Sequence, residues 1–205
     1  RAWKLDRVLK GLAGAELLAT YGTEREYAAD ENILNSTRAT DFITPKSEVS
    51  KLFRDAVLDL AQEHAFARRI VNSGRLSVPA TLHASPLNTP DTGAFVGTQM
   101  PGAVLLGAPL TKQGQPTWLL RALGPDFTLL VFGPAPAWAR DLPGAKVLQI
   151  GIDVIDHQAL AAQRLDALPR TVYLVRPDQH VCARWRLSLL HISEPTRRYA
   201  ISYAV

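Results

Sequence analysis

The first part of the chain carries the spacing of apolar residues that is typical of helices. A first helix is expected over residues 1–11, with Gly11 and Gly14 as its stop. Its apolar positions are Trp3, Val8, Leu9 and Leu12. A second helix is expected over 15–43, because Pro45 disfavours helix in the residue before it. The polar stretch 23–32 predicts that this helix lies across a surface instead of filling a core.

A third helix has the most regular apolar stripe. Ser47 can cap its first turn, since a serine hydroxyl accepts a hydrogen bond from a free backbone N–H. The apolar residues that follow at helical spacing are Val49, Leu52, Phe53, Ala56, Val57 and Leu60. The pattern continues less regularly through Ile70 and Val71 and stops at Asn-Ser-Gly, residues 72–74.

Residues 78–114 have no periodicity and are rich in proline and glycine, which is typical of a long connection. The sequence therefore predicts a helical segment over 1–76, a linker over 77–101 and a second domain over 102–188.

Short helices and strands alternate in the second domain. The expected elements are a helix at 117–123, a buried strand at 127–132, a helix at 137–142, a strand at 146–150, a helix at 156–167, a strand at 172–175, a turn at 177–179 and a strand at 181–185. Strands separated by helices and closed by a hairpin are typical of the thioredoxin fold. The predicted fold class is therefore α/β. Residues 189–205 do not fit, because Pro195 and β-branched residues oppose a closing helix, so we expect a non-homologous tail there.

Composition excludes several classes of function. The 205 residues are 47% hydrophobic with a net charge of +4, which is ordinary for a globular protein. The basic residues are scattered instead of forming a stripe with aromatics, so no nucleic-acid partner is expected. No apolar run approaches the roughly 20 residues that span a bilayer, so no membrane partner is expected. The single cysteine, Cys182, cannot form an internal disulfide, and we expect a cytoplasmic protein.

Redox chemistry is not expected of the second domain. A thiol–disulfide enzyme needs a cysteine pair at the start of the helix after the first core strand. Residues 133–138 read Gly-Pro-Ala-Pro-Ala-Trp at that place, so the domain lacks a C-x-x-C motif. Cys182 falls in the last strand and is expected to be a buried structural thiol.

The remaining polar candidates have structural interpretations. Asp153 and Asp156 bracket a helix start and are expected as caps, and Arg38 with Asp41 as a solvated pair. None of the histidines stands at metal-ligand spacing, and the one nearest an apolar stripe is expected in the core. The histidines are His64, which is that core candidate, His83, His157, His180 and His191.

Several strings along the chain share the order and spacing of one enzyme family. They are Ala2-Trp3-Lys4-Leu5 with Leu9 and Gly11, Leu17-Leu18 through Tyr21 to Glu24-Arg25, Asn35 to Phe42, Asn72 to Ser77, and Ser85 to Asp91. Together they resemble the C-terminal part of class A FAD-dependent aromatic monooxygenases, the p-hydroxybenzoate hydroxylase family, and within it the 3-(3-hydroxyphenyl)propionate hydroxylases. The resemblance covers roughly residues 1–186. It departs at Glu26-Tyr27, where the family usually has Arg-Pro.

The resemblance implies an enzyme that uses FAD, NAD(P)H and molecular oxygen to hydroxylate a phenolic substrate. The sequence has no G-x-G-x-x-G turn for the pyrophosphate and no Gly-Asp segment or Gly-rich loop for the isoalloxazine ring, which in the family lie before the counterpart of Arg1. We therefore expect a structural fragment, with no catalytic, cofactor-binding or metal-binding residue and no cofactor bound by this chain alone. The expected partners are the N-terminal FAD-binding domain of the same polypeptide and a second copy of the chain.

A second interpretation stays open beside this one. The chain can also be a stand-alone thioredoxin-like module without redox activity, which binds a partner or dimerises. A dinucleotide motif upstream in the full gene favours the first interpretation, and a genuine start codon near Arg1 favours the second. Whether the chain is itself an enzyme stays equally open, as do the aromatic substrate and the choice of NADH or NADPH.

Overall fold

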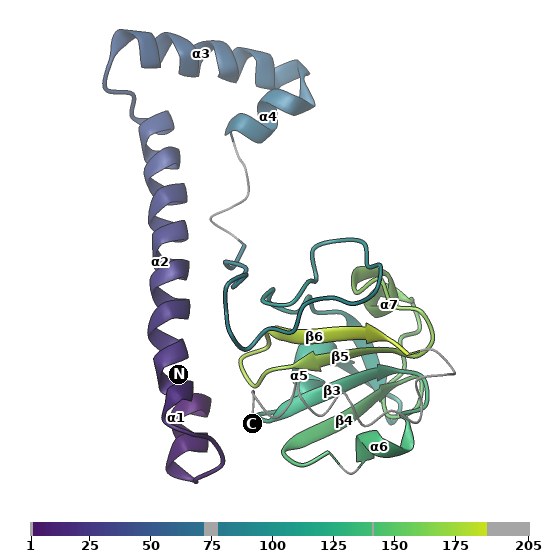
Figure 1. Ribbon diagram of the computed structural model, residues 1–205. Coiled ribbons are helices and arrows are strands. Elements are labelled where there is room, and N and C mark those ends of the chain that lie inside the picture. The colour runs from purple at the N-terminus through teal and green to yellow at the C-terminus, as the bar shows by residue number, and fades with distance from the viewer. Residues whose placement is uncertain (1, 72–77, 141, 188–205) are drawn as a thin grey trace. The chain divides into compact units, whose positions relative to one another are not determined.

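The computed structural model describes residues 2–71, 78–140 and 142–187 (Figure 1). The helix stop expected at 72–74 and the tail expected at 189–205 lie outside the described residues. The chain divides into two compact units, Arg1–Glu24 with Thr81–Val205, and Arg25–Ala80. The boundaries expected from the sequence, at 76/77 and 101/102, stay a prediction.

Helix α1 (Ala2–Leu9) and helix α2 (Glu16–Ile43) form where the sequence predicts them. Their buried faces are not the predicted ones. Leu9 is exposed, whereas Lys4 and Arg7 are the buried residues of α1. In α2 the buried residues are Leu17 and Glu24, seven apart and hence on one face of the helix. The expectation that the polar stretch of α2 lies on a surface is therefore wrong at Glu24, because charged partners from distant segments meet it there.

Helix α3 (Glu48–Glu63) begins as predicted, with the Ser47 hydroxyl accepting a hydrogen bond from the Ser50 N–H at 3.1 Å. The apolar pattern that continues to Val71 does not form one helix. The chain takes an extended conformation at His64, and α4 (Ala65–Val71) follows. His64 is exposed, so its predicted place in the core is wrong. It is the single residue between the end of α3 and the start of α4.

The α/β prediction is confirmed by a four-stranded sheet in the order β4-β3-β5-β6 (Figure 1). The strands are β3 (Phe127–Phe132), β4 (Ala145–Ile150), β5 (Thr171–Val175) and β6 (Val181–Arg186). Strand β3 pairs in parallel with β4 and antiparallel with β5, and β5 pairs antiparallel with β6. A parallel pair joined to a closing hairpin is the arrangement on which the thioredoxin-like interpretation rests, and that interpretation stays a prediction.

Side chains alternate between two apolar clusters, one for each face of the sheet. Leu130 and Phe132 belong to one cluster, together with residues of α5 (Leu119–Leu123) and α7 (Leu160–Arg164). Phe127, Leu129 and Val131 belong to the other, with Ala139 of α6 (Ala137–Arg140) and Trp3 of α1 packed against them. Helix α1 therefore belongs to the cover of the sheet, although it lies more than a hundred residues before it in the sequence.

The sequence missed a hairpin of β1 (Pro109–Lys112) and β2 (Gln115–Trp118). Its two turn residues, Gln113 and Gly114, have φ values of 49° and 77°. A two-residue hairpin turn of this kind needs positive φ at both positions, because its twist then matches that of the strands. Thr117 and Trp118, expected in a helix, lie in β2 instead. The helix expected over 156–167 is also shorter, because the residues before Leu160 form a turn.

Residues 89–103, called the strap below, contain no helix or strand, as their proline and glycine content predicts. They are nevertheless bonded to the outer edge of β6. The Thr89 N–H donates to the Cys182 carbonyl at 2.8 Å, and the Val181 N–H donates to the Ala103 carbonyl at 2.8 Å. Because β6 ends the sheet, the strap occupies backbone groups that would otherwise be free to pair with another chain.

Within the described ranges, we find no helix of the length and apolarity that crossing a membrane requires.

Candidate functional site

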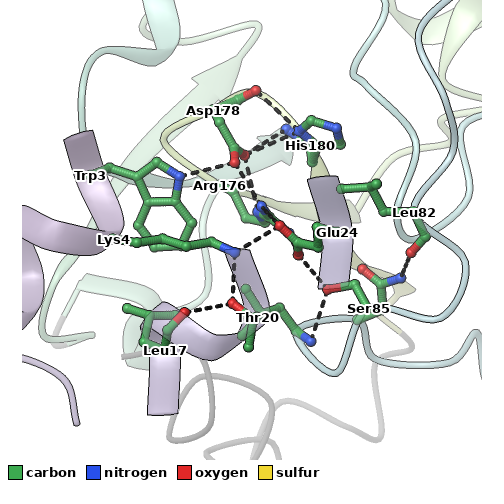
Figure 2. Close-up of polar contacts among 12 residues, drawn as sticks. Trp3, Lys4, Leu17, Thr20, Glu24, Leu82, Ser85, Arg176, Asp178 and His180 are labelled. Carbon is green, nitrogen blue, oxygen red and sulfur yellow. Dashed lines mark hydrogen bonds and ion pairs between the residues drawn. The ribbon is translucent and has the colours of Figure 1, made fainter. Parts of the chain in front are cut away.

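A group of buried polar side chains connects α1, the first turns of α2 and the turn between β5 and β6 (Figure 2). We call it the charge cluster. Its members are Trp3, Lys4, Thr20, Glu24, Ser85, Arg176, Asp178 and His180. All of them belong to the first compact unit. Lys4, Glu24 and Arg176 are only 2%, 6% and 2% exposed, although charged side chains rarely leave water without partners.

Glu24 lies at the centre of the charge cluster, and both of its carboxylate oxygens are fully used. Oε1 accepts from Arg176 Nη1 at 2.7 Å and from the Ser85 hydroxyl at 2.6 Å. Oε2 accepts from Lys4 Nζ at 2.7 Å and from Arg176 Nη2 at 3.0 Å. The paired bonds to Arg176 have the fork geometry that makes arginine–carboxylate contacts both strong and directional.

Asp178 is the second carboxylate of the cluster. It accepts from Arg176 Nε at 3.0 Å and from Arg176 Nη2 at 2.6 Å. The indole Nε1 of Trp3 donates to it at 2.9 Å, which connects α1 to the β5–β6 turn. His180 Nδ1 lies 3.2 Å from the same carboxylate. The two cations Lys4 and Arg176 therefore face the two carboxylates of Glu24 and Asp178.

The protonation states of the carboxylates follow from this geometry. Burial alone would raise the pKa of Glu24, but the hydrogen bonds and charge of Arg176, with hydrogen bonds from Lys4 and Ser85, lower it to about 2. Burial likewise opposes the charge of Asp178, yet His180 and Arg176 hold the pKa of its carboxyl well below the usual range. Both groups are thus charged at any pH near neutrality.

Of the two cations, Arg176 is held in its charged form. The carboxylates of Glu24 and Asp178 raise the pKa of Arg176 against the effect of its burial, so it stays protonated. Burial lowers the pKa of Lys4, but its ammonium donates to Glu24 and to the Thr20 hydroxyl at 2.6 Å. A general acid or base needs a pKa near the working pH, and the Glu24–Arg176–Asp178 chain has none. That chain of three residues is therefore suited to holding segments together and unsuited to proton transfer.

Cys182 lies in β6 with an exposed fraction of 1%, within the apolar cluster of Phe127 and Val131. Burial raises the pKa of its thiol to about 12. The thiolate is the reactive form of cysteine, so this side chain is inert near neutral pH. The predicted burial of this thiol is confirmed, and its purely structural role stays a prediction.

The other polar candidates from the sequence have local roles. Asp156 caps as predicted, since its carboxylate accepts from the N–H groups of Leu160 at 3.1 Å and Ala162 at 3.0 Å. Asp153 does not cap a helix; it accepts from the Gln149 N–H at 2.8 Å and closes the turn after β4. Asp41 pairs with Lys46 at 3.3 Å instead of with Arg38.

His180 is the one sequence candidate that joins the charge cluster. His83 and His157 are exposed, as His64 is, and His191 lies outside the described residues. In the described ranges, no group of three or more His, Cys, Asp or Glu side chains is placed to hold a metal ion.

The turn after β3 does not have the form of a pyrophosphate site for FAD. A pyrophosphate is held by free backbone N–H groups in a glycine-rich turn between a strand and a helix. The turn after β3 has Pro134 and Pro136, which lack an N–H. The Gly133 N–H donates to the Ile150 carbonyl at 3.0 Å, and the Ala135 N–H donates to the Gln149 side chain at 2.9 Å. Both of these donors are already engaged, so we derive no step through a flavin bound by this turn.

Sequence reasoning missed the charge cluster as a site. Glu24 was noted only as part of the Tyr21 to Arg25 string, and Asp178 only as a turn residue. One signal was available: Glu24 lies on the same helical face as Leu17, and Lys4 on the same face as Arg7. A charged residue at a core position of a helix indicates a buried partner, but it does not identify that partner.

No protein-family model matches the sequence, and no curated protein matches it significantly. Solved structures share its fold. The flavin-dependent monooxygenase PieE, solved with FAD and substrate, is 22% identical over 98% of this chain, with a TM-score of 0.62. Aklavinone-11 hydroxylase, solved with FAD and aklavinone, is 21% identical over 98% of the chain, with a TM-score of 0.57. RebC with bound 7-carboxy-K252c is 23% identical over 93% of the chain, with a TM-score of 0.60.

The chain spans 42%, 37% and 38% of the length of these three proteins. The matches agree with the prediction that it resembles the C-terminal part of such an enzyme. At this level of identity they show a shared fold, and function has to be argued separately.

Proposed function

We propose that this chain is the C-terminal part of an FAD-dependent monooxygenase and that it contributes structure to the enzyme instead of flavin chemistry. The observation that carries the proposal is the extent of the match. PieE aligns with 98% of the chain, so the helices before residue 72 and the α/β sheet are matched together. A chance likeness of a small α/β sheet would not extend over the long helix α2 as well.

The chemistry of the chain supports the division of labour in this proposal. The Gly133 and Ala135 N–H groups of the turn after β3 are already engaged, and Cys182 is buried and protonated. Glu24 stays ionised and Arg176 stays protonated. FAD, NAD(P)H, oxygen and a phenolic substrate would then be bound by residues outside this chain, in a cytoplasmic enzyme whose flavin carries the oxygen chemistry.

The test uses the complete open reading frame from which the chain comes. Its purified product should contain flavin and should oxidise NADH or NADPH faster when a substituted phenol is added, with a product one oxygen atom heavier by mass spectrometry. The chain alone is the matched control and should show neither property. A full-length product without flavin, or one that no member of a panel of phenols stimulates, would remove the support for a hydroxylase.

The alternative is a stand-alone module that binds a partner or dimerises. It is favoured by the self-contained core of the sheet, in which β3 and β5 are buried along their whole length. A reading frame that starts with a methionine codon near Arg1 and encodes no upstream dinucleotide motif would decide for this alternative.

A further inference from the structure

One face of the sheet has little local cover. Phe127, Leu129 and Val131 point to this face, and the described helix that follows β3, α6, is four residues long. Helix α1 adds to this cover from the other end of the chain. The Trp3 ring stands edge-on to Phe127 with 5.5 Å between ring centroids. The Arg7 guanidinium lies 4.8 Å from the centre of the same ring.

Polar contacts hold α1 in this place. Arg7 Nη2 donates to the Gly144 carbonyl at 3.0 Å, beside the start of β4. Trp3 Nε1 donates to Asp178 in the β5–β6 turn at 2.9 Å. Both contacts join residues more than a hundred positions apart, so they are tertiary contacts and do not depend on helix formation alone.

Glu24 connects the two helices to each other and to the sheet. Its Oε2 accepts from Lys4 of α1, and both of its oxygens accept from Arg176 at the end of β5. The same carboxylate therefore fixes α1 to α2 and both helices to the sheet. Loss of the Glu24 carboxylate therefore removes the ion pair of α2 with Lys4 and the ion pair of α2 with Arg176.

We propose that α1 and the first turns of α2, residues 2–24, form a clasp that covers the Phe127 face of the sheet and is held by the charge cluster as a latch. The clasp undocks as one body, while the sheet stays folded. The inference is independent of the proposed function, since it concerns only contacts within the first compact unit.

Unequal burial explains why the clasp opens first. Lys4 and Arg7 are the buried residues of α1, and its apolar residues Leu5 and Leu9 are exposed. Strands β3 and β5 are buried at every position. Segments with few buried apolar contacts open at lower free energy than core strands. A latch of ion pairs also opens abruptly, because removing one partner leaves the others buried and unpaired.

Native-state hydrogen exchange of the whole chain, read by mass spectrometry of its peptides, tests the clasp. Glu24→Gln should raise exchange over residues 2–9 and 16–24 by roughly tenfold or more. Exchange over 127–132 should change by less than about threefold. Asp6→Asn is the matched control, because it removes a carboxylate of α1 from an exposed pair with Lys10 and should leave both regions unchanged.

A second variant distinguishes a loss of the latch from a general loss of folding. Glu24→Gln leaves Lys4 and Arg176 facing Asp178 alone, and adding Lys4→Met restores the balance of one cation and one anion. Exchange over 2–9 should therefore be slower in the double variant than in Glu24→Gln. Equal acceleration in the clasp and in β3, no acceleration in the clasp, or a double variant that exchanges faster than the single one would each overturn the proposal.

Discussion

Glu24 shows how a single side chain can carry contacts that no local pattern reveals. It lies in a polar stretch of α2 that sequence reasoning assigned to a surface, and it is 6% exposed. Its partner Arg176 is 152 positions away. A buried ion pair is weak evidence for stability by itself, because desolvation offsets the attraction. Breaking one is costly, and that asymmetry makes Glu24 the residue to test.

The free energy of unfolding should fall at low pH as Glu24 becomes protonated. Its pKa falls from 4.5 to about 2 on folding, so its contribution is complete above pH 4.5 and is lost as the pH falls toward 2. The loss should be on the order of 3 kcal/mol, and the lowered pKa of Asp178 acts in the same direction. Urea unfolding across this pH range measures it. In Glu24→Gln the stability should fall less steeply over the same interval, and an unchanged slope would contradict the assignment.

Cys182 should behave as a small packed side chain. Cys182→Ala should lower the free energy of unfolding by about 1 kcal/mol, the scale expected for a small buried group. The native thiol should react with an aromatic disulfide reagent only as fast as the protein opens, because its pKa of about 12 leaves almost no thiolate. Any hydroxylase activity of the full-length enzyme should be unchanged in Cys182→Ala. A loss of turnover at unchanged stability would show that the thiol has a chemical role.

At the level of elements, most of the strap lies in the segment predicted as a linker, and it covers the outer edge of β6. Arg184 of β6 donates to Asp91 through Nε at 2.9 Å and through Nη2 at 2.6 Å. The Phe95 ring lies 4.3 Å from the Arg184 guanidinium and 4.5 Å from that of Arg186. These contacts fasten the strap in addition to its backbone bonds with β6.

Asp91→Asn should loosen the strap, since Arg184 is buried and loses its charged partner. We expect a loss on the order of 2 kcal/mol in unfolding free energy, together with faster amide exchange over 181–186 and a greater tendency to aggregate through the open edge. Asp41→Asn, which removes an exposed carboxylate from α2, is the matched control. If both variants are equally stable and equally soluble, the strap does not protect the edge.

Helix α3 presents an apolar stripe that the described residues leave uncovered. Val49, Leu52 and Phe53 are 78%, 72% and 59% exposed, whereas Val57 is buried. In this chain, Phe53→Ala should therefore change the unfolding free energy by less than about 0.5 kcal/mol, and Val57→Ala should cost about 2 kcal/mol. Chemical unfolding followed by helical circular dichroism measures both. A large effect of Phe53→Ala would mean that the stripe is already packed.

At the level of the whole molecule, the sequence predicted elements well and their mutual contacts poorly. The strand 127–132 follows from an apolar run between two Gly-Pro pairs, and the strand 172–175 from an apolar run between two prolines, which are local signals. The β1–β2 hairpin was missed because Gln-Gly is a weaker turn signal than Asn-Gly. The charge cluster was missed because its partners come from opposite ends of the chain, and periodicity marks charged residues as surface ones.

The family-specific strings between Ala2 and Asp91 indicated a class of related proteins, which the periodicity of apolar residues could not do. They indicated flavin-dependent monooxygenases, and the structures that share the fold over 93–98% of the chain include PieE and aklavinone-11 hydroxylase. What stays a proposal is the division of labour: this chain shapes the enzyme, and its flavin is bound elsewhere.

Equilibrium binding of FAD, followed by the quenching of flavin fluorescence, tests that division most directly. It is measured on this chain alone and on the product of the complete reading frame, under the same conditions. We predict stoichiometric binding by the complete product and no saturable binding by the chain at micromolar concentrations. The reason is that the turn after β3 has two prolines and its Gly133 and Ala135 N–H groups are already engaged. Stoichiometric quenching by the chain alone at micromolar affinity would contradict the account.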